Sequence, residues 1–66
     1  MLTLIQMLKF FKKQGLSKQE ALAEIVIILE FGEGPFELSI EQKTRARKVC
    51  EDENKLKSAL ATWDIL

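Results

Sequence analysis

The chain turns from one predicted helix into the next at residues 15–20, which read GLSKQE. Gly15 follows a cationic run that includes Lys12 and Lys13, as a glycine does when it ends a helix in the left-handed conformation. Ser17 and Glu20 have the spacing of a capping box, in which the serine hydroxyl accepts from the N3 backbone N–H and the glutamate accepts from the N-cap N–H. This stretch therefore predicts that one helix ends and a second begins within a few residues.

A second capping box, in its glutamine form, begins at Ser39 and places Gln42 at N3. Residues 32–38 separate the two boxes and contain two glycines and the only proline, which mark a linker. We therefore expect an all-α fold with three helices, covering about residues 3–14, 18–31 and 40–64. The first two form an antiparallel hairpin in this prediction, and a bend in the long third helix is compatible with the modest helix propensity of residues 52–54.

The apolar run EIVIILEF at residues 24–31 is rich in β-branched side chains, so a strand competes with a helix there. The capping box ahead of the run and the spacing of its apolar residues favour the helix. The inner face of this helix is predicted to consist of Ala21, Leu22, Ile25, Val26, Ile28 and Leu29.

The back of the same helix is apolar as well, with Ala23, Ile27 and Phe31 at positions i, i+4 and i+8. A helix that is apolar nearly all round is buried on more than one side, and two other short helices cannot surround it. These three residues are therefore predicted to contact a second protein chain. The alternative is that the third helix or Phe36 of the linker covers them within one subunit.

Two further aromatic residues are predicted to contribute to such an interface. Phe10 lies among polar residues, opposite the apolar side of its helix, and Trp63 is a residue type enriched in binding hot spots. Trp63 also ends an apolar stripe on the last helix, so a place in the core is the competing interpretation. That stripe consists of Ala46, Val49, Leu56, Leu60 and Trp63.

The length of 66 residues limits the chain to one domain, residues 1–66. A core of this size supplies only about 3–5 kcal/mol, and small proteins usually add a disulfide, a metal or a second subunit. Cys50 has no partner cysteine, and the absence of histidine removes the usual zinc sets. Association, as a homodimer or with another protein, is the remaining device, and the hydrophobic fraction of 47% suits it.

The amino-terminal segment has no basic residue before its apolar part and no small-residue cleavage site after it, so it predicts no signal peptide. No apolar run approaches the roughly 20 residues that cross a bilayer. Together with the single free cysteine, these features predict a cytoplasmic protein. An interfacial membrane helix at residues 3–14 is disfavoured, because its apolar face is needed for the core.

The net charge is zero, but four bases gather at the start of the third helix. Arginine and lysine at that place can pair with guanine and phosphate, so a DNA-reading helix is an alternative prediction. The seven-residue linker is long for such a motif, and the four bases do not share one face. A solvated, salt-bridged surface is the competing interpretation. The residues concerned are Lys43, Arg45, Arg47 and Lys48.

The composition favours no enzyme, because the chain lacks histidine and tyrosine and has no glycine-rich phosphate loop. Cys50 has no imidazole partner, so no catalytic residue, cofactor or metal is predicted. The leading hypothesis is a non-enzymatic interaction or regulatory module that works by helix-mediated association. The alternative is a small dimeric DNA-binding transcriptional regulator.

Overall fold

The computed structural model describes residues 2–32, 34 and 36–66. The described residues contain helices and no strand, so the predicted all-α fold is confirmed. Glu33 and Pro35 of the predicted linker lie outside the described residues. In chain order the elements are α1 (Leu2–Lys13), α2 (Lys18–Phe31), α3 (Ile40–Glu51), α4 (Glu53–Ala61) and a short 3₁₀ helix η1 (Thr62–Ile65).

The first capping box forms as predicted and sets the start of α2. The Glu20 backbone N–H donates to Oγ of Ser17 at 3.2 Å, and the Ser17 backbone N–H donates to Oε1 of Glu20 at 3.0 Å. Gly15 has a φ of 88°, which lets the chain reverse between α1 and α2. At the other end, Gly32 closes α2 in the left-handed conformation with its N–H bonded to the Ile28 carbonyl.

The prediction of one long third helix over residues 40–64 is wrong. The second capping box starts α3, with Gln42 N–H donating to Oγ of Ser39 at 3.1 Å, but Asp52 ends α3 and caps α4. Its backbone leaves the helical region, at φ −93° and ψ 109°. Its carboxylate accepts from the backbone N–H groups of Asn54 and Lys55 at 3.0 and 3.1 Å. A strong N-cap residue therefore converts the anticipated bend into a new helix start.

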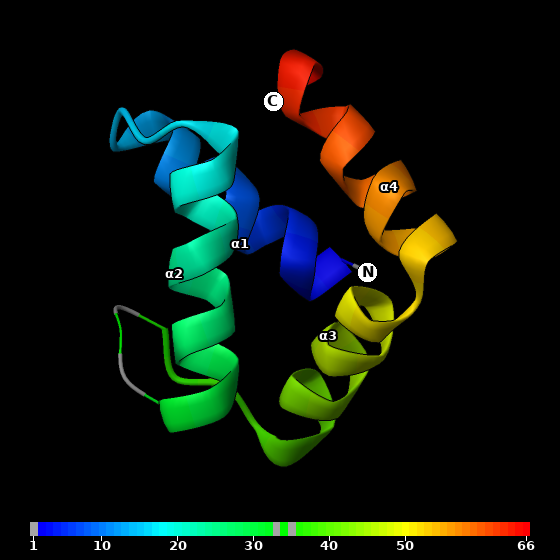
Figure 1. The fold of residues 1–66 in the computed structure, drawn as a ribbon. Helices are drawn as coiled ribbons and strands as arrows, with labels where there is room; N and C mark the ends of the chain where they lie inside the picture. Colours follow the sequence, from blue (N-terminus) through cyan, green and yellow to red (C-terminus); the bar gives the residue numbers. More distant parts are fainter. Residues whose placement is uncertain (1, 33, 35) are drawn as a thin grey trace.

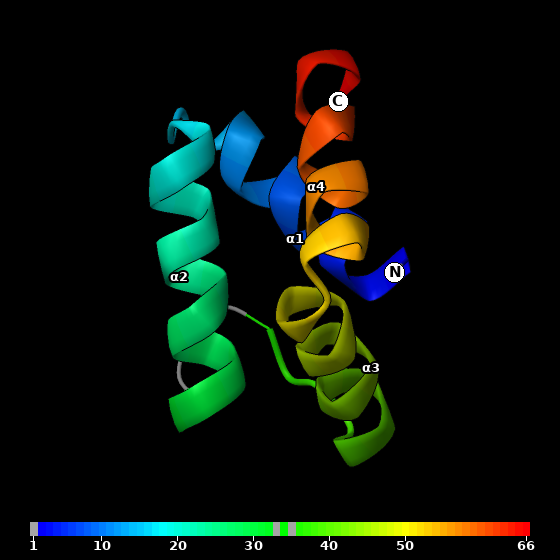
Figure 2. The same cartoon turned by 45° about the vertical axis from the view of Figure 1, so that its right-hand side comes forward.

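The helix α1 lies in the middle of the molecule. Figures 1 and 2 show it between α2 on one side and the α3–α4 arm on the other, and it contacts α2, α3 and η1. In both views α1 and α2, the two helices of the predicted antiparallel hairpin, run in opposite senses and cross obliquely. The oblique path lets α1 bury its apolar side against three elements at once.

The core is wholly apolar among the described residues. Three residues of α1, Leu4, Met7 and Leu8, are completely inaccessible to solvent, in keeping with the central place of this helix. The buried residues of the whole core are Leu4, Met7, Leu8, Phe11, Ala21, Ile25, Ile28, Leu29, Ala46, Val49 and Ala59.

The linker determines which side of α2 is buried near its end. Gly34 passes so close to Ile28 that a Cβ on the glycine would lie 2.5 Å from Cγ1 of Ile28. This contact buries Ile28, whereas Val26, which was predicted on the inner face, is 39% exposed and Leu22 is half-buried. The buried face of α2 is thus shifted toward Ile28 and the linker, and away from Val26, compared with the predicted inner face.

Candidate protein-interaction surface

The back of α2 is exposed to solvent in the part of the chain that the structure describes. Ala23 is exposed, Ile27 is 41% exposed and Phe31 is 70% exposed. We call these three residues the α2 stripe. The structure places them together on the outward side of the helix, as the sequence indicated, and their role as an interface stays a prediction.

The two elements that were considered as covers for the α2 stripe lie elsewhere. Phe36 of the linker packs edge-to-face on Phe10, with ring centroids 5.0 Å apart, and on Phe11, with centroids 6.0 Å apart. It therefore contacts α1 and not the back of α2. The helix α3 faces the side of α2 that carries Val26 and Leu29.

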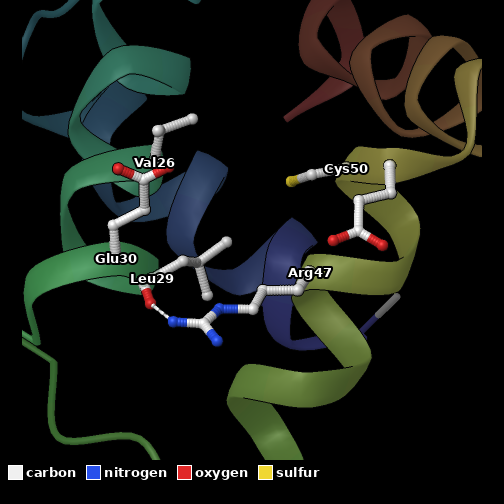
Figure 3. Close-up of a pocket in the computed structure, with 6 residues that line it drawn as sticks. Val26, Leu29, Glu30, Arg47 and Cys50 are labelled. Carbon is white, nitrogen blue, oxygen red and sulfur yellow. Dashed lines mark hydrogen bonds between the residues drawn. The ribbon is translucent and has the colours of Figure 1, made fainter.

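A groove of about 330 Å³ lies between α2 and α3, next to the α2 stripe. Figure 3 shows Val26, Leu29 and Glu30 on the α2 side and Arg47 and Cys50 on the α3 side. We call it the α2–α3 groove. Because the half-exposed Val26 lies one residue from Ile27, the groove extends the apolar surface of the stripe around the helix.

Arg47 crosses this groove to bind the end of α2. Its Nη2 donates a hydrogen bond to the main-chain carbonyl of Leu29 (Figure 3). Lys43, one turn earlier on α3, is close by: its Nζ lies 3.5 Å from the position that a Cβ would take on Gly32. Cations are favourable beside the unpaired carbonyls at a helix C-terminus. Both side chains therefore act within the fold.

This placement divides the four bases that were predicted as candidate DNA contacts. Lys43 and Arg47 are directed at the end of α2, while Arg45 and Lys48 are exposed on other sides of α3. The structure does not gather them on one face, in agreement with the spacing along the helix. It therefore offers no single basic surface at this place for a phosphate backbone to contact.

Cys50 lies in the α2–α3 groove with its sulfur directed toward α2 (Figure 3). Burial raises the pKa of the Cys50 thiol, and the negative charge of Glu51 raises it further. A raised pKa keeps the thiol protonated at neutral pH, which lowers its reactivity as a nucleophile. In the part of the chain that the structure describes, no cluster of three metal-ligating side chains occurs.

A second, shallower groove lies on the outer side of α1, and sequence reasoning found only one of its residues. It encloses about 360 Å³, with aromatic and cationic lining residues. We call it the α1 groove. Phe10, predicted as an exposed interface residue, is instead half-buried between Phe11 and Phe36. The lining residues are Gln6, Lys9, Phe10, Lys13 and Phe36.

Trp63 is half-buried in η1 and packs against the core cluster. The Lys12 ammonium lies 5.5 Å from the centroid of the Trp63 ring and donates a hydrogen bond to the Trp63 carbonyl. Lys12 thus joins α1 to η1 through a cation–π contact and a hydrogen bond. This favours the core interpretation of Trp63 over the interface interpretation.

Comparison of this chain with family models, with curated proteins and with solved structures finds no match. Every helix in residues 2–32, 34 and 36–66 falls short of the length and hydropathy that a membrane crossing requires.

Proposed function

We propose that this chain is a small non-enzymatic interaction or regulatory module that works by helix-mediated association, as a homo-oligomer or with a partner protein. The observation that carries the proposal is the exposure of the α2 stripe. The two large side chains of the stripe, Ile27 and Phe31, are spaced i and i+4 on one outward helix face, which is a spacing of the anchors with which helices bind partners. The adjoining α2–α3 groove enlarges the apolar area available to a partner.

Energetics support this proposal. Fully burying a side chain such as isoleucine or phenylalanine stabilises by about 1.5–3 kcal/mol relative to leaving it exposed. Ile27 and Phe31 keep 41% and 70% of their surface exposed. Covering them would add a substantial fraction of the roughly 3–5 kcal/mol that a core of this size supplies.

The cysteine chemistry fits a binding module better than an enzyme. The thiol of Cys50, which lies in the groove nearest the stripe, has a raised pKa and no imidazole in the chain to activate it. An unpaired cysteine suits a reducing compartment, so the proposal places the module in the cytoplasm. The DNA-binding alternative has less support, because Lys43 and Arg47 are directed at the end of α2.

The test is to replace Ile27 with glutamate and to measure association. Light scattering after size exclusion would give the mass of the wild type across a concentration series, and capture experiments would give its protein partners. We expect Ile27→Glu to abolish association while the far-UV circular dichroism is unchanged, because the side chain is outward and the substitution puts a charge in the buried patch.

The matched control is Ile40→Glu. Ile40 is 84% exposed at the first position of α3, where a carboxylate is favourable for the helix dipole. The substitution Ile40→Glu should leave association intact. A wild type that is monomeric at every concentration and captures no protein in an Ile27-dependent manner would refute the proposal. Retention of DNA at low salt, with loss in Lys48→Glu but not in Ile27→Glu, would favour the alternative.

A further inference from the structure

The outward faces of α1 and α2 carry opposite charges. The α2 stripe is flanked by glutamates, and the α1 groove is flanked by lysines. We propose that the α2 stripe of one copy docks into the α1 groove of a second copy, in a head-to-tail contact between identical chains. The inference rests on the proposed function, to which it adds the identity of the partner.

The acidic side of the contact comes from Glu24 and Glu30, both exposed. At about 100° per residue they lie on opposite flanks of Ile27 on the helix surface. Glu20 is on the same face, but its carboxylate accepts the Ser17 N–H of the capping box. The one base on α2 is Lys18 in its first turn, and at about 100° per residue it lies on the side of the helix opposite Ile27. No base on α2 therefore lies beside these two glutamates.

The basic side comes from Lys9 and Lys13, which are exposed one turn apart on α1. Beside these lysines, Phe10 of α1 and Phe36 of the linker form an aromatic floor, with their rings nearly perpendicular at 80°. An additional ring such as that of Phe31 can pack on this floor in the edge-to-face geometry that aromatic residues prefer. The lysines would then lie beside the glutamates that flank the incoming helix.

A two-fold dimer of α2 stripes is opposed by the same charges. In a parallel arrangement each glutamate faces its own copy. In an antiparallel arrangement centred on Ile27, residue 24 of one chain faces residue 30 of the other, which is again glutamate against glutamate. Like charges placed opposite each other are unfavourable in helix pairs and in interfaces. The head-to-tail contact replaces each of these repulsions with an attraction.

A head-to-tail contact has a distinct consequence for assembly. Every pair of chains keeps one unused α2 stripe and one unused α1 groove, so growth continues until a ring closes or a chain of subunits forms. Two variants that each destroy one half of the contact should therefore remain monomeric alone and associate when they are mixed. In the mixture, the intact stripe of one variant binds the intact groove of the other, and no further subunit can be added.

The experiment uses Ile27→Glu, which destroys the stripe, and the double variant Lys9→Glu/Lys13→Glu, which reverses the groove charge. Each alone should be monomeric at a concentration at which the wild type assembles. Their equimolar mixture should form a species of twice the 7.6 kDa mass of one chain. It should dissociate as salt is raised, since exposed charges are screened.

The matched control for the groove variant is Lys55→Glu/Lys57→Glu, a double charge reversal on exposed positions of α4. It should assemble as the wild type does. If Lys9→Glu/Lys13→Glu is less folded by circular dichroism, the single variant Lys9→Glu replaces it and should weaken assembly at least several-fold.

The outcomes separate the inference from the proposed function. If Ile27→Glu blocks assembly but the groove variant does not, or if the mixture stays monomeric, the head-to-tail contact is wrong while association through the stripe stands. A monomeric wild type that binds another protein through Ile27 would likewise show that the head-to-tail contact is wrong and that association through the stripe stands. If neither variant alters assembly, both the inference and the proposed function fail.

Discussion

Nη2 of Arg47 in α3 donates a hydrogen bond to the main-chain carbonyl of Leu29 in the last turn of α2. The last four carbonyls of a helix lack partners within the helix, and the dipole there favours a positive charge. α2 has no basic residue in its own last turn. Arg47 thus supplies, from another helix, a cap that the sequence of α2 lacks.

We expect Arg47→Ala to lower the free energy of unfolding by about 1–2 kcal/mol, because it removes a charge-assisted hydrogen bond and a favourable dipole interaction. Urea denaturation followed by circular dichroism measures this loss. Arg45→Ala, at an exposed position of the same helix, should change stability by less than about 0.5 kcal/mol. Equal effects of the two substitutions would show that the Leu29 contact is not stabilising.

Gly34→Ala should destabilise the protein by about 1–3 kcal/mol, for two reasons. The glycine has a φ of 142°, and a Cβ there would lie 2.5 Å from Cγ1 of Ile28. Gly15→Ala is the control, because its φ of 88° is also strained but nothing lies within 4 Å of the added atom. The effect of Gly34→Ala should shrink in an Ile28→Ala background, where the clashing atoms are gone. An unchanged effect there would leave backbone strain as the whole cause.

The capping box at Ser17 makes stability depend on acidity. Hydrogen bonds from the Ser17 backbone N–H and hydroxyl lower the pKa of Glu20. A carboxyl whose pKa is lowered by folding stabilises above its unfolded pKa, at about pH 4, and this contribution is lost as pH falls through the lower folded value. Glu20→Gln should therefore be less stable than the wild type at pH 7, and the difference should close in acid.

Ser17→Ala provides the spectroscopic check on this interpretation. It removes the hydroxyl and should move the Glu20 pKa back toward the ordinary glutamate value in an NMR titration. A Glu20 titration that is insensitive to Ser17→Ala would show that the hydroxyl has no part in the shift.

Signals confined to a few neighbouring residues were enough to predict the helix starts. Each serine cap needs only a partner three residues later, so Ser17 and Ser39 identify the first residues of α2 and α3, and Gly32 identifies the end of α2. The same local logic applies to Asp52, which is a strong N-cap residue. Because no glycine or proline occurs near Asp52, the sequence favoured one continuous helix, and the capping role of Asp52 was not predicted.

Features that depend on how the helices pack were not predictable from spacing alone. Periodicity could indicate that Ile27 lies on the back of α2, because opposite faces of a helix follow from its 3.6-residue repeat. It could not indicate that the linker returns over Ile28 and leaves Val26 exposed. Phe10 packs against Phe36 of the linker, so the α1 groove is formed by two separate segments. The periodicity of one helix therefore could not predict it.

Asp52→Ala should lower stability by about 1 kcal/mol, the usual cost of losing an N-cap. The helical content should remain or rise, because alanine favours continuation of α3 into α4. Asp52→Asn should lie close to the wild type, since an amide oxygen also accepts from the Asn54 and Lys55 N–H groups. Circular dichroism with thermal unfolding measures both quantities. A loss of stability as large in Asp52→Asn as in Asp52→Ala would contradict the capping role.

Cys50 should react slowly with iodoacetamide near neutral pH, and the reason lies in its surroundings. Burial in the α2–α3 groove and the adjacent Glu51 both raise the thiol pKa, so a smaller fraction is thiolate at any pH below it. Unfolding in urea should accelerate alkylation because it removes the burial, which is the larger cause, and Glu51→Gln should accelerate it modestly in the folded protein. Glu53→Gln is the control, on an exposed side of α4. If the folded and unfolded chains are alkylated at the same rate across the pH range, the groove does not shield the thiol, and the contact between α2 and α3 that forms it is looser than the structure shows.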